Sequence, residues 1–123
     1  MPTSSSLPLA RVAPHERLDA FVVARELVAF VAQHRGRWRG LPGEAGPQLE
    51  RAAVSAMLNV AEAAGRQALR DRQRVFAIAR GEVCEAAAAI DVAVLFGALT
   101  AEQAAPARAL LDRLTRMLSR LSR

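Results

Sequence analysis

The side chains most able to do chemistry are too few and too scattered to predict an active site. His15 and His34 fall near the two ends of one expected helix, and no glutamate precedes either histidine by three residues. A di-metal centre in a helical bundle needs such Glu-x-x-His pairs. Cys84 is the only cysteine, and neither it nor Ser55 has a histidine nearby in sequence that could activate it. The sequence therefore predicts no enzyme, no metal and no cofactor.

Arginine carries all of the fixed positive charge. The 123 residues include 17 arginines, no lysine and 12 acidic residues, which gives a net charge of +5. A guanidinium is a planar donor suited to phosphate, and a tryptophan beside it could stack on a base. The candidate nucleic-acid contacts are Arg35, Arg37, Trp38, Arg39, Arg66, Arg70, Arg72 and Arg74. These residues form two groups in the sequence, at 35–39 and at 66–74. For either group taken alone, an ordinary solvated surface is the simpler interpretation.

Four helices are expected to position these residues. Apolar residues recur at helical spacing, alanine is abundant, and no stretch alternates as a strand would. The expected helices span about 14–34, 47–66, 69–96 and 101–122, with a loop rich in glycine and proline at 36–47. We predict an all-α fold, an antiparallel up-down-up-down four-helix bundle over residues 14–123. A flexible N-terminal tail is expected at 1–13.

Individual residues set the expected ends and faces of these helices. Thr100 and Gln103 form a capping-box pattern, and Gly97 should end the preceding helix. Pro106 is expected to bend the last helix, and Gly81 weakens the third unless another group packs there. The apolar stripe of the first helix is expected to comprise Leu18, Phe21, Val22, Val28, Ala29 and Ala32.

The expected helix at 47–66 has an unusually narrow polar face. Its polar residues fall within an arc of about 80° on a helical wheel and comprise Arg51, Ser55, Asn59, Glu62 and Arg66. One apolar side can face the core, and it comprises Leu49, Ala53, Ala56, Val60 and Ala64. The other side has no obvious partner in a four-helix monomer and comprises Val54, Met57, Leu58 and Ala61. Because exposed apolar patches mark association surfaces, we predict a homo-oligomer that uses this second side. A tightly wrapped monomer with an alanine-rich surface is the alternative.

Four stretches of the sequence resemble one family. They are LERAAVSAMLNVAEAAGR, VFAIARGEVCEAAAAIDVA, FGALTAEQ and LLDRLTRMLSRL, and they resemble the four-helix bundle proteins of the 23S rRNA intervening-sequence family over roughly residues 15–121. The polar residues that match the family pattern are Arg51, Ser55, Asn59, Glu62, Arg66, Arg80 and Glu85. The sequence departs from that pattern at Ala68, where a serine would cap the third helix, and at 56–58, where a proline is lost.

The resemblance implies a bundle that assembles as a ring, typically a homopentamer, with no established enzymatic activity. A related branch comprises the accessory proteins of diversity-generating retroelements, which work with a reverse transcriptase and bind nucleic acid. We therefore expect a non-enzymatic, homo-oligomeric scaffold or adaptor that binds a protein or nucleic-acid partner. The alternative is a basic nucleic-acid-binding accessory factor that works with a reverse transcriptase or on structured RNA.

The location of the protein is expected to be the bacterial cytoplasm. The start of the chain, MPTSSSLPLARVAP, lacks the basic residues and the long apolar run of a signal peptide. No apolar stretch without a charge reaches the length that spans a bilayer, about 18 residues, so no membrane partner is expected.

Overall fold

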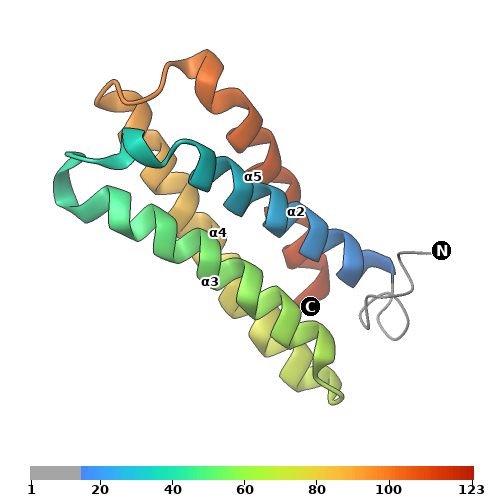
Figure 1. The fold of residues 1–123 in the computed structure, drawn as a ribbon. Helices are drawn as coiled ribbons and strands as arrows, with labels where there is room; N and C mark the ends of the chain where they lie inside the picture. The colour runs from blue at the N-terminus through green and yellow to red at the C-terminus, as the bar shows by residue number, and fades with distance from the viewer. Residues whose placement is uncertain (1–14) are drawn as a thin grey trace.

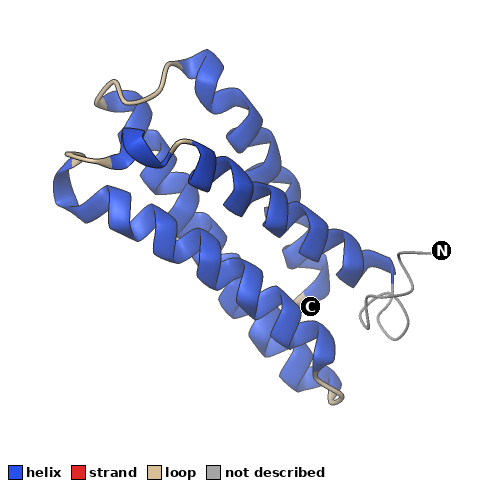
Figure 2. Ribbon diagram, viewed as in Figure 1, coloured by secondary structure: helices blue, strands red, loops and turns tan. Residues whose placement is uncertain are grey.

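The computed structural model describes residues 15–123, which form four long helices and two short 3-10 helices (Figure 2). The long helices are α2 (His15–Gln33), α3 (Ala45–Gly65), α4 (Leu69–Leu95) and α5 (Ala101–Leu121). The short ones, η2 (Arg35–Trp38) and η3 (Pro42–Glu44), lie between α2 and α3. Since no strand occurs within the described residues, the all-α, four-helix prediction is confirmed. The tail expected at 1–13 lies outside them.

The connections between the helices gather at two opposite ends of the molecule (Figure 1). At one end, which we call the loop end, the α2–α3 loop meets the α4–α5 turn, and Arg37 Nη1 donates to the carbonyl of Ala98 at 3.1 Å. At the other, which we call the turn end, the α3–α4 turn lies near the start of α2 and the C-terminus. There Arg17 Nη1 donates to the carbonyl of Ala64 at 3.3 Å, and Gln73 Nε2 donates to the carbonyl of Arg123.

The core is made of alanine rows on two helices and larger side chains from all four. Fully buried alanines of α3 and α4 include Ala52, Ala53, Ala56, Ala63, Ala79, Ala86 and Ala93. Their small side chains let the helix backbones approach closely. The largest fully buried side chains include Leu27, Leu49, Phe76, Ile90 and Leu114. Among the described residues no polar or charged residue is buried, so polar chemistry is confined to the surface.

The predicted helix ends are confirmed at the α4–α5 turn. Thr100 Oγ1 accepts a hydrogen bond from the Gln103 backbone N–H at 3.0 Å, and the Gln103 side chain accepts from the Thr100 N–H at 2.9 Å. Gly97 has a φ of +79°, which ends the preceding helix as expected. Helix α5 continues through Pro106, so the bend expected there stays a prediction.

The apolar stripe predicted for the first helix is only partly correct, because Phe21 and Val28 pack against the core but other residues of the stripe do not. The buried residues of α2 are Ala20, Val23, Ala24, Leu27, Phe30 and Val31. In contrast, Val22 is 45% exposed, and Ala29 and Ala32 are exposed as well. Apolar residues occur on nearly every side of this helix, so periodicity alone could not select the face that packs against α3 and α5.

The segment predicted as a loop at 36–47 is more structured than expected. Helix α3 begins at Ala45, and a Cβ on Gly46 would lie 2.4 Å from the carbonyl oxygen of Trp38. The glycine therefore lets the first turn of α3 press against the 3-10 helix η2. Glu44 adopts a left-handed conformation, with a φ of 61°, at the residue before α3.

Candidate functional site

The outer side of α3 exposes large apolar side chains. Val54 is 44% and Leu58 is 61% exposed, and these residues are one helical turn apart. Met57 and Ala61, the other two residues of the predicted interface, are half-buried. The structure therefore places all four at or near the surface of a single copy, with Val54 and Leu58 the most accessible.

Two shallow hollows meet at Val54. One holds about 260 Å³ between α2 and α3 and is lined by Val28, Val31, Ala32, Arg35, Glu50, Ala53 and Val54. The second holds about 490 Å³ along α3 and is lined by Pro47, Glu50, Arg51, Val54, Ser55 and Leu58. Both hollows share Val54 and Glu50, so one apolar surface continues from the α2–α3 groove onto the outside of α3.

The narrow polar face of α3 forms its hydrogen bonds within the molecule. Arg51 Nη2 lies 3.2 Å from Glu85 Oε2 and so joins α3 to α4. Asn59 Nδ2 donates to Ser55 Oγ at 3.4 Å. The Arg51–Glu85 pair therefore stabilises the contact between α3 and α4, whereas the Asn59–Ser55 hydrogen bond lies within α3.

The Arg80 guanidinium, also part of that pattern, joins two helices. Its Nη1 donates to Ser119 Oγ of α5 at 3.5 Å. Glu62 pairs with Arg66 at the (i, i+4) spacing, as the sequence suggests. Such exposed contacts contribute little to the stability of the fold.

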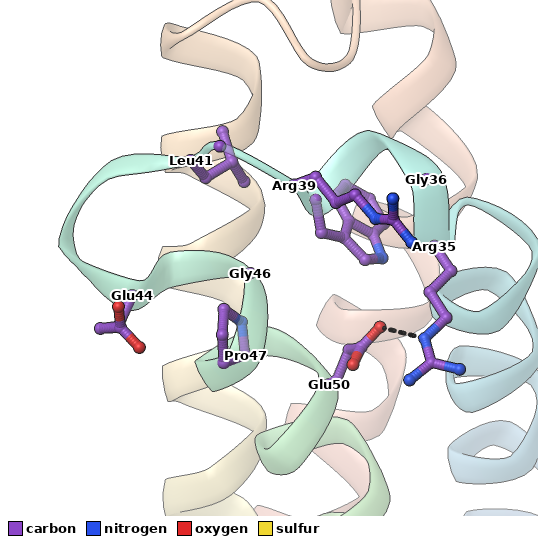
Figure 3. Close-up of a pocket in the computed structure, with 10 residues that line it drawn as sticks. Arg35, Gly36, Arg39, Leu41, Glu44, Gly46, Pro47 and Glu50 are labelled. Carbon is purple, nitrogen blue, oxygen red and sulfur yellow. Dashed lines mark hydrogen bonds and ion pairs between the residues drawn. The ribbon is translucent and has the colours of Figure 1, made fainter.

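The loop end surrounds a pocket of about 630 Å³ (Figure 3). Arg35 Nε lies 3.0 Å from Glu50 Oε2 across one side of this pocket. Arg37 Nη1 bonds the Ala98 carbonyl at 3.1 Å and Gln103 Oε1 at 3.4 Å. Arg39 forms no hydrogen bond or ion pair with another described residue.

The prediction that Trp38 stacks on a base is wrong. Its side chain is only 3% exposed, and its Nε1 donates to the carbonyl of Val31 at 2.9 Å. The indole joins the short helix η2 to the end of α2, and its ring could reach a base only if this end unfolded. His34 stacks on Phe30 with ring centroids 4.1 Å apart, and its Nδ1 lies 2.8 Å from the Phe30 carbonyl oxygen.

At the turn end, several arginines have acidic partners. Arg66 pairs with Glu62 and, at 2.7 Å, with Asp71, and Arg74 pairs with Asp71 at 3.0 Å. Hydrogen bonds from Arg74 and then from Arg66 hold the pKa of the Asp71 carboxyl below its ordinary value. The bond to Glu62, followed by that to Asp71, raises the pKa of Arg66.

Arg72 and Arg17 have carbonyl partners at the same end. Arg72 Nη1 donates to the carbonyls of Arg66 at 3.3 Å and Gln67 at 2.8 Å. Arg17, which the sequence did not single out, donates to Ala64, and Arg70 is exposed nearby. No sequence signal pointed to Arg17, because it lies 47 residues away from its partner along the chain.

The two predicted arginine groups do not form one surface. Arg35, Arg37 and Arg39 lie at the loop end, whereas Arg66, Arg70, Arg72 and Arg74 lie at the turn end. Helix α3 connects the two ends, and its 21 residues span about 30 Å at 1.5 Å per residue. A partner would have to follow the whole length of the molecule to contact both groups.

Residues 15–123 offer few features of other kinds of site. Within that range no three side chains of histidine, cysteine, aspartate or glutamate gather closely enough to hold a metal ion. None of its helices combines the length and the apolar character needed to cross a membrane. Cys84 is an exposed free thiol on α4.

These features define an all-helical protein whose distinctive surfaces are an apolar helix face and two arginine-bearing ends. The family model of the 23S rRNA-intervening sequence protein matches residues 18–120. Because this match covers most of the chain, the protein belongs to the 23S rRNA-intervening sequence protein family, as the resemblance indicated. No curated protein matches the chain.

Proposed function

We propose that the protein is a non-enzymatic scaffold that assembles from several identical copies through the outer side of α3. The observation that carries this proposal is the pair of exposed apolar residues, Val54 and Leu58, beside two shallow hollows. Complete burial of a leucine side chain contributes about 1.5–3 kcal/mol. In a closed assembly the same contact occurs between every pair of neighbouring copies, so this burial free energy is gained at each interface.

Charge pairing on the same surface favours contact between like-charged copies. Each copy has a net charge of +5, so distributed repulsion opposes association. Next to Val54, however, Arg35 pairs with Glu50, and Arg51 pairs with Glu85. The apolar surface is thus bordered by neutralised pairs, which lowers the electrostatic cost of bringing two copies together.

The family resemblance suggests that five copies assemble as a ring. Each copy would be a bundle whose four helices run antiparallel, in up-down-up-down order. The placement of the loops and turns at two opposite ends fits that order. The scaffold would present a protein or nucleic-acid partner with several copies of the same surface. We also propose that the protein is located in the cytoplasm of a bacterium.

The proposal is tested by sedimentation velocity of the wild-type protein and of Leu58→Glu at micromolar concentrations. The wild-type protein should sediment as an oligomer, and Leu58→Glu should shift it towards monomer because a carboxylate cannot be buried unpaired at the interface. Leu95→Glu is the matched control, since Leu95 is 80% exposed at the loop end. Equal dissociation of both variants, or a wild-type monomer, would overturn the proposal.

A second candidate function is that of a nucleic-acid-binding accessory factor, which works with a reverse transcriptase or on structured RNA. Arg39 and Arg70 favour it, because they are exposed and form no ion pair with a described residue. This function predicts binding to RNA or DNA that weakens steeply as salt increases. Absence of binding in a low-salt anisotropy assay would remove it while leaving the scaffold proposal intact.

A further inference from the structure

The carbonyl groups at the end of α3 hold two arginine side chains from different helices. Arg17 of α2 reaches Ala64 at 3.3 Å, and Arg72 of α4 reaches Gln67 at 2.8 Å. Both arginines are half-buried. Their guanidiniums are therefore fixed in place by the backbone, and no carboxylate is needed to orient them.

These two cations lie close enough to affect one another. Burial, followed by repulsion from the Arg72 guanidinium, lowers the pKa of Arg17 from its ordinary value. Among the residues whose side chains the structure describes, no carboxylate forms an ion pair with either arginine. The nearby carboxylates of Glu62 and Asp71 pair with other arginines instead. Two neighbouring positive charges are thus left without a counter-charge from that part of the chain.

Both guanidiniums keep donors for a ligand. A guanidinium has five N–H groups on three nitrogens, and each of these arginines bonds its carbonyl partners through Nη1 alone. Toward the described residues, Nε and Nη2 of both arginines therefore remain for another acceptor. Arg70 is exposed in the first turn of the same helix as Arg72 and adds a further positive charge at this end.

We propose that Arg17 and Arg72 form a phosphate-binding site at the turn end of the bundle. A phosphate group offers several acceptor oxygens and a negative charge, and arginine forks bind it in bidentate geometry. The site goes beyond the scaffold function and does not depend on assembly. It would also supply the second candidate function with a defined point of contact.

The ligand is recognised through its phosphate and not through a stacked ring. Among residues 17–123, Phe96 is the one exposed aromatic residue, and it lies at the opposite end of the molecule. The phosphate can belong to a nucleic-acid backbone or to a small phosphorylated compound, because both present the same oxygens. The loop end is the weaker candidate, since Glu50 pairs with Arg35 there and Glu44 lies on the same pocket.

Two titrations of the full chain test this site and separate the two sources. Inorganic phosphate is added while the arginine Nε–Hε signals are followed by NMR, and a 16-base-pair RNA duplex is added while anisotropy is followed. Arg17→Gln and Arg72→Gln should each weaken binding about tenfold, the usual effect of losing a charge-assisted hydrogen bond. Arg70→Gln, which leaves the carbonyl contacts intact, should weaken it by a smaller factor.

Arg113→Gln is the matched control, because it removes the same charge from an exposed arginine of α5 that is not a candidate nucleic-acid contact. It should change either affinity less than twofold. Circular dichroism identifies any variant that fails to fold, and Arg70→Gln still tests the site in that case. Duplex binding that depends on Arg17 and Arg72 assigns the phosphate to nucleic acid, and an effect on inorganic phosphate alone assigns it to a small ligand. Equal loss in Arg113→Gln, or no response to either probe, would overturn the proposal.

Discussion

Single residues at the turn end determine how its charges respond to pH. Asp71 accepts hydrogen bonds from Arg74 and Arg66, and these hold the pKa of its carboxyl below the ordinary value. An acid whose pKa is lower in the folded state stabilises the fold above its unfolded pKa, near 4. That contribution is lost as the pH falls below this value.

The Asp71→Asn substitution should therefore lower the melting temperature at pH 7 and have a smaller effect at pH 3. At pH 3 the unfolded chain already binds the proton at Asp71, so part of the stabilisation by the ionised carboxylate is lost in the wild-type protein. Thermal melts followed by circular dichroism at the two pH values check this prediction. A loss of the same size at both values would show that Asp71 acts through packing and not through its charge.

Two glycines on the long helices should respond oppositely to the same substitution. In Gly46→Ala the new Cβ would lie 2.4 Å from the Trp38 carbonyl oxygen, so about 1–3 kcal/mol of unfolding free energy should be lost. In Gly81→Ala nothing lies within 4 Å, so alanine should add about 0.5–1 kcal/mol through its helix propensity. Urea denaturation measures both variants, and destabilisation by Gly81→Ala would indicate that another copy packs on that position.

At the scale of the elements, one helix end lacks the cap that its neighbour has. Thr100 caps α5 through its side chain, whereas Ala68 precedes α4 with an extended backbone and no side-chain hydrogen bond. A serine with this backbone can accept a hydrogen bond from the first turn of the helix. Ala68→Ser should therefore stabilise the protein by about 1 kcal/mol, measured by urea denaturation, with the exposed Ala101→Ser as the control. An equal gain in both variants would contradict the capping explanation.

Local signals predicted the helices well because those signals act over one or two turns. The capping box at Thr100 and the left-handed Gly97 are set by neighbouring residues, and both were correct. Burial of Trp38 and the buried face of α2 depend on contacts between helices. No short stretch encodes those contacts, so the predicted base-stacking role was wrong and the predicted stripe was only partly correct.

At the scale of the whole molecule, the fold determines which arginines lie together. Helix α3 holds the two candidate arginine groups at opposite ends. The fold also brings Arg17 to the end of α3, next to Arg72. The positive charges are thus divided between the two ends of the molecule. The sequence could supply the residues but not this placement.

The apolar side of α3 is the feature on which the proposed scaffold function depends. The helical wheel predicted that Val54, Met57, Leu58 and Ala61 would lie away from the core, and in a single copy Val54 and Leu58 are exposed. A single copy does not reveal whether another copy covers these two residues. The oligomeric state of the protein in solution does.

Light scattering coupled to size-exclusion chromatography, across micromolar concentrations, tests this central claim most directly. The single chain has a mass of 13.2 kDa. The proposed scaffold function predicts a mass that is a stable integer multiple of this value, with five copies for the ring that the family resemblance suggests. In Leu58→Glu the mass should return towards that of a single chain. A mass of one chain for the wild-type protein at every concentration would contradict it.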